Sequence, residues 1–148
     1  MSKLWEKNQQ VDAKIEAFTV GRDTEMDLFL AKHDVLGSMA HIRMLAAVGL
    51  LDAAELPVLT QELKRIYALA ASDAFVIEAG VEDVHSQVEL MLTRTLGDMG
   101  KKIHSGRSRN DQVLLDMKLF TREAIQETVA AVNELFDVLI AQSERYKS

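Results

Sequence analysis

The residues best suited to chemistry lie in a short basic segment, 101–110, which reads Lys-Lys-Ile-His-Ser-Gly-Arg-Ser-Arg-Asn. It directly precedes a predicted helix, and a helix N-terminus attracts anions. Because arginine binds carboxylates in a bidentate manner, the segment is a candidate cradle for a carboxylate or phosphate. Two other interpretations stay open. In the first, Ser108 and Asp111 cap the helix and the basic side chains are simply exposed to solvent. In the second, the segment binds RNA, although it has no interleaved aromatic residues for base stacking.

A second candidate is a polar row on the first predicted helix. Asp34, Ser38 and His41 are spaced at i, i+4 and i+7, so they share one face beside Gly37. Such a row either forms a satisfied hydrogen-bond network or lines a site. A glycine inside a helix costs about 1 kcal/mol, which indicates close approach of another chain segment or a ligand.

His85 is the third candidate, since it follows two acidic residues, 82–83, at the start of a predicted helix. A histidine there is a general acid or base, a charge near a substrate, or a surface residue. We expect His33 to face solvent. No His-x-x-x-His or Asp-x-Asp pattern supports a metal site, and the glycine-rich nucleotide-binding patterns are absent.

The elements that position these residues are predicted to be helices. The chain has 148 residues with only 7 Gly and 1 Pro, too few turn formers for a fold of many short strands. Apolar periodicity predicts helices over 25–48, from 52 or 57 to about 70, from 82 or 83 to 96, and from 107 onward. Thr24 and Asp27 have the spacing of a capping box, and Gly49 is placed to end the first helix. The sequence therefore predicts an all-α fold.

The last predicted helix is too long for a compact domain. From Arg107 to Ser148 there is no Gly or Pro, and two apolar stripes run side by side. About 38 residues would extend about 57 Å, whereas a globule of this size is about 40 Å across. We therefore expect an exposed apolar surface, which requires either a helical bundle of several chains or more protein than these residues provide.

The composition and hydropathy of the chain exclude or disfavour several classes of protein. A net charge of −6 disfavours a nucleic-acid binder. The chain has no Cys, which excludes disulfides and thiolate chemistry and suits a reducing compartment, so we expect a cytoplasmic protein. No stretch approaches the roughly 20 apolar residues of a membrane span, and the N-terminus lacks a signal-peptide core.

Three segments together resemble the argininosuccinate lyase family. They are 105–113 (Ser-Gly-Arg-Ser-Arg-Asn-Asp-Gln-Val), 82–85 (Glu-Asp-Val-His) and 37–41 (Gly-Ser-Met-Ala-His), the last followed by Met44 and Leu45. The related fumarase, aspartase and adenylosuccinate lyase groups carry other residues at the Arg-Ser-Arg-Asn-Asp position. The resemblance extends from about Ile15 to the end of the chain.

The resemblance implies an enzyme that splits argininosuccinate into arginine and fumarate by anti elimination, without cofactor or metal, as a homotetramer. It implies that Ser38 and Asn110 bind substrate and that Arg109 contacts or orients a substrate carboxylate. It gives His85 a role in binding or charge stabilisation. The dianionic intermediate of such an elimination needs concentrated positive charge, which the basic segment offers.

The departures from the family are also informative. Its Thr-His-Leu-Gln segment and its Gly-Ser-Ser loop, which carry the catalytic His and Ser, have no counterpart here, so no catalytic residue is assigned. Residues 6–9, Glu-Lys-Asn-Gln, replace the family's Gly-Gly-Arg-Phe, and Ser105 stands where Thr is common.

We therefore interpret the chain as an N-terminal fragment, inactive alone, with a helical domain at 1–106 and the first long bundle helix at 107–148. The alternative is a non-enzymatic, crystallin-like helical module.

Overall fold

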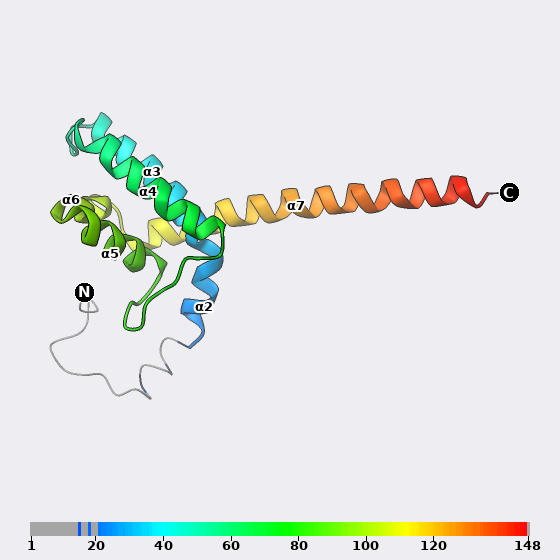
Figure 1. Cartoon of the computed structure of the whole chain (residues 1–148), viewed down its shortest axis with the longest axis horizontal. Coiled ribbons are helices and arrows are strands. Elements are labelled where there is room, and N and C mark those ends of the chain that lie inside the picture. Colours follow the sequence, from blue (N-terminus) through cyan, green and yellow to red (C-terminus); the bar gives the residue numbers. More distant parts are fainter. Residues whose placement is uncertain (1–14, 16–17, 19–20, 148) are drawn as a thin grey trace.

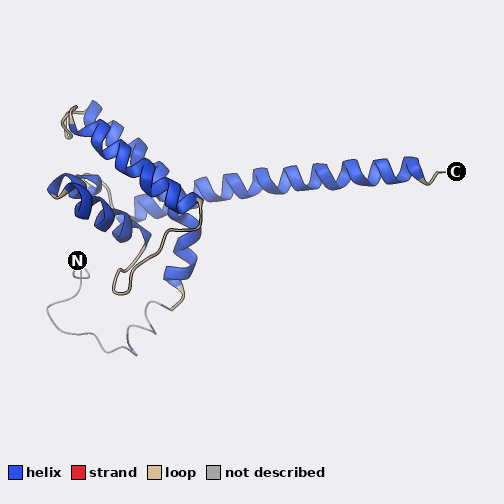
Figure 2. Ribbon diagram, viewed as in Figure 1, coloured by secondary structure: helices blue, strands red, loops and turns tan. Residues whose placement is uncertain are grey.

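The computed structural model describes residues 15, 18 and 21–147, and residues 6–9 lie outside this part (Figures 1 and 2). The described residues contain helices and no strand, which confirms the predicted all-α fold. None of these helices has the length and apolar content to cross a membrane. The elements in chain order are α2 (Asp23–Asp27), a 3-10 helix (Leu28–Leu30), α3 (Ala31–Ala47), α4 (Glu55–Ala71), α5 (Val84–Leu96), α6 (Asp98–Lys101), a second 3-10 helix (Lys102–His104) and α7 (Arg109–Arg145).

The first predicted helix is present as three successive segments, α2, the 3-10 turn and α3. The predicted capping box at Thr24 and Asp27 is wrong. Arg22 occupies the N-cap position of α2 without a side-chain cap. The Asp27 carboxylate instead accepts a hydrogen bond from the backbone N–H of Val84, at 3.1 Å, in the first turn of α5. A long-range partner has therefore replaced the local one that the spacing suggested.

The core is built mainly from the antiparallel pair α3 and α4, which lie side by side in Figure 1. Gly49 lies directly after the C-cap of α3. Its φ of 76° is a left-handed conformation that favours glycine and ends the helix. The buried apolar residues of the two helices face each other, and those of α5 close the third side. They are Val35, Ile42, Leu45, Leu59, Leu63, Ile66, Val84, Val88 and Leu92.

The short helix α6 packs closely on α5. A Cβ atom on Gly100 would lie 2.5 Å from the backbone carbonyl carbon of Leu92, so only glycine fits at this position without backbone movement. This contact directs the chain back toward α3, and the basic segment 101–110 follows it.

The start of α7 has a complete capping box. The Asp111 carboxylate accepts from the backbone N–H of Ser108 at 2.8 Å, and Ser108 Oγ accepts from the backbone N–H of Asp111 at 3.4 Å. Ser108 and Asp111 therefore cap the helix as expected, but the basic side chains are not simply solvated, because Lys102 and Arg109 form ion pairs.

The long helix α7 attaches to the other helices through a polar face. Gln112, Asp116 and Glu123 share one side of the helix and contact residues of α3 or its neighbours. At the crossing, Leu115 of α7 lies over Gly37 of α3, where an added Cβ would be 2.8 Å from Leu115 Cδ2. The close approach predicted at Gly37 is confirmed.

Beyond the crossing, α7 projects away from the other helices (Figure 1). Every residue from 127 to 147 is exposed, including apolar ones. The predicted exposed stripe is thus present, and its large members past the crossing are Ile125, Val129, Val132, Leu135, Phe136, Val138, Leu139 and Ile140.

Candidate functional site

The predicted site residues come from three helices that meet where α7 crosses the small domain. Ser38 is buried in α3 and His85 is buried in the first turn of α5. Arg109 and Asn110 form the first turn of α7. Because the three helices are separated in the chain, only the fold brings these residues into one neighbourhood.

At the meeting point lies a buried polar group that we call the central cluster: Asp34, His85, Gln112 and Asp116. His85 Nδ1 donates to Asp34 Oδ1 at 2.8 Å, and Gln112 Nε2 donates to the same oxygen at 3.2 Å. Asp116 Oδ2 is 3.8 Å from His85 Nδ1. Asp34 and Asp116 are each only 1% exposed, so these contacts lie in a medium of low polarity, where they are strong.

Burial and neighbouring charge change the acidity of this cluster. Burial, together with the charge of Asp34, raises the pKa of Asp116 to about 7, against the opposing effect of His85 and Arg107. Burial alone would lower the pKa of His85. The hydrogen bond and charge of Asp34, together with the charges of Asp83 and Asp116, outweigh this effect, so the pKa of His85 lies above its usual value. Near neutral pH Asp116 is therefore partly protonated, and the raised pKa of His85 favours its imidazolium form.

Arg107 connects the central cluster to Ser38. Its Nη2 donates to Ser38 Oγ at 2.9 Å, and burial lowers the pKa of the guanidinium while the charges of Asp34 and Asp116 oppose that change. Since Ser38 Oγ accepts this hydrogen bond, its own O–H remains available as a donor.

Arg109 is held by acidic residues at the start of α5. Its Nη1 lies 2.9 Å from Glu82 Oε2 and 2.9 Å from Asp83 Oδ2, and its Nη2 donates to Ser86 Oγ at 2.9 Å. This arrangement fastens the start of α7 to the start of α5. These partners hold the guanidinium in place, which supports an orienting role for Arg109.

Asn110 differs from its neighbour because its amide is unused. It is exposed on the first turn of α7, and its side chain makes no hydrogen bond within the described part of the chain. The lysines of the basic segment are engaged. Lys101 Nζ lies 2.6 Å from Asp98 Oδ1, and Lys102 Nζ lies 2.6 Å from Glu55 Oε1. The segment is therefore less positive than its sequence suggests.

The prediction for His33 is wrong. This residue is 3% exposed, and its Nε2 donates to Glu123 Oε2 of α7 at 2.7 Å. Its ring meets Phe120 edge to face. Sequence alone could not indicate this because the partners lie about 90 residues downstream. His41 is half-buried, and its Nε2 donates to the carbonyl of Ser105 at 2.8 Å, which holds the basic segment against α3.

Asp34, His85 and Asp116 also have the donor types of a metal site, with ligand atoms within 4.8 Å of one another. No spacing pattern in the sequence indicates this group, because the three residues come from three helices. Two of the three are already engaged with each other, since His85 is hydrogen-bonded to Asp34, and Arg107 lies within electrostatic reach of both carboxylates. The arrangement is a buried polar network that orients the imidazole of His85.

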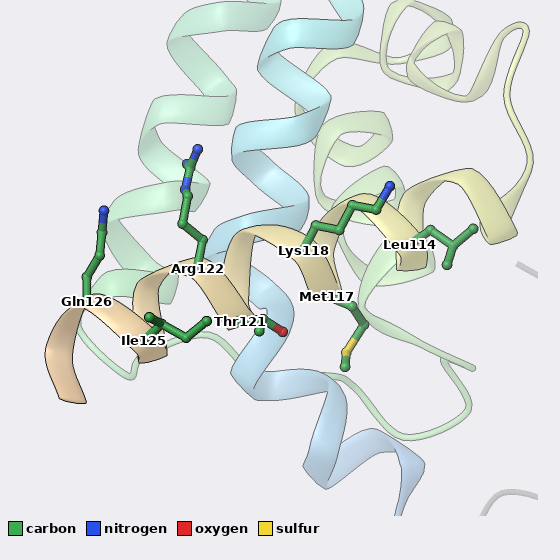
Figure 3. Close-up of a pocket in the computed structure, with 7 residues that line it drawn as sticks. All are labelled: Leu114, Met117, Lys118, Thr121, Arg122, Ile125 and Gln126. Carbon is green, nitrogen blue, oxygen red and sulfur yellow. The ribbon is translucent and has the colours of Figure 1, made fainter. Parts of the chain in front are cut away.

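A trough of about 500 Å³ lies on the opposite side of α7, and all its lining residues come from this one helix (Figure 3). Leu114, Met117 and Ile125 give it an apolar floor, with Lys118 and Arg122 at its edge. Because no second element closes it, the trough is part of the exposed apolar stripe and not a ligand pocket.

Comparison with known proteins gives consistent results. A family described as "Lyase" matches residues 6–148. The argininosuccinate lyase of Parabacteroides distasonis is 72% identical over 145 residues, which cover 98% of this chain and 32% of that protein. That of Bacteroides fragilis is 72% identical over 146 residues, 99% of this chain and 33% of that protein.

A more distant relative, the argininosuccinate lyase of Xanthomonas axonopodis pv. citri, is 39% identical over 142 residues, 95% of this chain and 33% of that protein. The chain thus spans about a third of the length of the curated relatives it matches, as its long unpartnered helix predicted.

Proposed function

The chain belongs to the lyase family, and we propose from this membership that it is part of an argininosuccinate lyase, which releases arginine and fumarate from argininosuccinate. The observation that carries the proposal is the 72% identity to proteins of that name over nearly the whole chain. The three motif segments support it, because the crossing of α3, α5 and α7 gathers them into one region.

The proposed reaction is an anti elimination that passes through a dianion. We assign substrate binding to Ser38, His85, Arg109 and Asn110. Three features support this: the pKa of His85 is raised, Ser38 Oγ accepts from Arg107, and the Asn110 amide has no hydrogen-bond partner among the described residues. Oriented donors and positive charge stabilise a developing carboxylate dianion. The groups that move the protons would come from segments that these 148 residues do not include, and the proposal requires no cofactor or metal.

We further propose a homotetramer in the cytoplasm that serves arginine biosynthesis, with residues 1–106 as a helical domain and 107–148 as a bundle helix. The exposed stripe on α7 supports the assembly, because an apolar face of this length is stable in water only when it is covered.

The test is an assay of the full-length lyase that contains these residues, which should release fumarate from argininosuccinate. The isolated 148-residue chain should show no measurable release, because it lacks the acid and base segments. Release by the chain alone at a rate near that of the intact enzyme would contradict the fragment interpretation. A folded full-length protein without activity would favour the crystallin-like alternative.

A further inference from the structure

We infer that Asp34 is a positioning residue for His85: it fixes the imidazole with Nδ1–H directed into the central cluster, so that Nε2 is the nitrogen presented to a bound ligand. This inference rests on the proposed function, in which His85 faces the substrate. It adds a role for Asp34, and for the helix crossing that buries it, to the set of binding residues.

The geometry at Asp34 is specific. Its Oδ1 accepts from both His85 Nδ1, at 2.8 Å, and Gln112 Nε2, at 3.2 Å, so the carboxylate is held from α5 and from α7 at the same time. The side chains of His85 and Asp34 are 5% and 1% exposed, which leaves little room for another rotamer. The imidazole orientation is therefore set by two helices other than its own.

The other edge of the imidazole is free. Within the described residues the hydrogen bonds of His85 involve Nδ1 alone, and Nε2 lies on the far side of the ring from Asp34. A histidine whose Nδ1–H is tied to a carboxylate has a defined tautomer in the neutral state. It offers Nε2 as an acceptor when neutral and as a donor when protonated.

Several charges act on this imidazole. Asp34 from α3, Asp83 from the start of α5 and Asp116 from α7 favour the imidazolium, and Asp27 is also close enough to interact with it. Arg107 offsets part of that field through its interactions with Asp34 and Asp116. Among the described residues, Asp34 alone is hydrogen-bonded to the ring, whereas Asp116 is 3.8 Å away. The two carboxylates can therefore be separated by experiment.

The experiment compares Asp34→Asn with the control Asp116→Asn in the full-length lyase, with imidazole ¹⁵N signals of His85 followed by NMR against pH. We expect Asp34→Asn to lower the pKa of His85 by about one unit or more and to mix its neutral tautomers. Asp116→Asn removes a nearby charge but no hydrogen bond, so the Nδ1–H tautomer should persist. Circular dichroism confirms that both variants are folded.

Kinetics give a second readout. In Asp34→Asn the pH limb of kcat/KM that follows His85 should move to lower pH, together with its NMR titration. A folded Asp34→Asn variant whose His85 keeps both its tautomer and its titration would overturn the positioning role. The NMR result does not depend on turnover. If the full-length enzyme were inactive toward argininosuccinate, the proposed function would be wrong, but the role of Asp34 could still be tested.

A metal titration separates the network from a cation site. Zn²⁺ or Mn²⁺ added to the unsubstituted protein should leave the Nδ1–H signal of His85 in place. Saturable binding that removes this signal, and that Asp34→Asn abolishes, would overturn the inference.

Discussion

At the scale of single residues, the most consequential group is the carboxyl of Asp116. Its burial raises its pKa to about 7 from an ordinary 3.8. A carboxyl with a raised pKa stabilises the fold while it is protonated. Its contribution is complete below pH 3.8 and is lost as pH rises to about 7. The pKa of His85 is also raised, so its contribution falls in the same direction above its ordinary value.

The variant Asp116→Asn should therefore be more stable than the original chain at pH 8, by about 1–3 kcal/mol, because it places no charge in the cluster. Urea unfolding at pH 5 and pH 8 measures this difference, which should shrink at pH 5. If the difference in unfolding free energy between the variant and the original chain were the same at both pH values, the pKa of Asp116 would not be raised by the fold.

Asn110 and Arg109 are neighbours with different expected roles. Asn110→Ala in the full-length enzyme should lower kcat/KM about 100-fold, the scale of a lost oxyanion donor, with stability within about 0.5 kcal/mol of the original. Arg109→Ala should lower both activity and stability because it also unfastens α7 from Glu82 and Asp83. Steady-state kinetics and thermal melts separate the two. Near-normal kinetics of the Asn110→Ala enzyme would show that Asn110 does not bind the substrate.

At the scale of elements, helix packing depends on two glycines with different tolerances. A Cβ at Gly100 would meet backbone atoms of α5 at 2.5 Å, whereas a Cβ at Gly37 would meet the flexible end of Leu115 at 2.8 Å. A side-chain end can move at small cost, but a packed helix backbone cannot.

Gly100→Ala should therefore lower the free energy of unfolding by about 3 kcal/mol. Gly37→Ala should stay within about 1 kcal/mol, since the displaced leucine is offset by better helix propensity. Both are measured by chemical denaturation. Similar losses in the two variants would show that α7 presses on Gly37 as rigidly as α5 presses on Gly100.

The sequence predicts these elements better than their contacts. Apolar periodicity locates α4, α5 and α7 to within a few residues, and glycines mark the ends of α3 and α5, because these signals are local. The role of Asp27 at α5 and the burial of His33 were missed because their partners are distant in the chain. The basic segment was recognised as important, but the pairing of its lysines and Arg109 with acidic residues depends on the fold.

At the scale of the whole molecule, α7 joins the small domain by its polar face and leaves its apolar face outward. This is the reverse of an ordinary surface helix, whose apolar side faces the core. The purified chain should therefore associate in solution through the outer part of α7.

The variant Val132→Glu, at a position that is 59% exposed on the stripe, should lower the mass measured by light scattering. Ala130→Glu is a matched control, since it adds the same charge to the polar side of the same helix. A chain that is already monomeric at tens of micromolar, or equal masses in the two variants, would show that the stripe does not drive association.

The polar attachment of α7 also makes this helix a lever. Among the described residues, the last hydrogen bond from α7 to the small domain is at Glu123, and 22 further residues to Arg145 extend about 33 Å beyond it. A rotation of about 5° at the crossing displaces the far end by about 3 Å, about twice the rise of one helical residue. The packing of Leu115 over Gly37 therefore determines the direction of the α7 axis as well as its attachment to α3. A small substitution at the crossing would therefore change the position of the distant end of α7 more than that of any residue near the crossing.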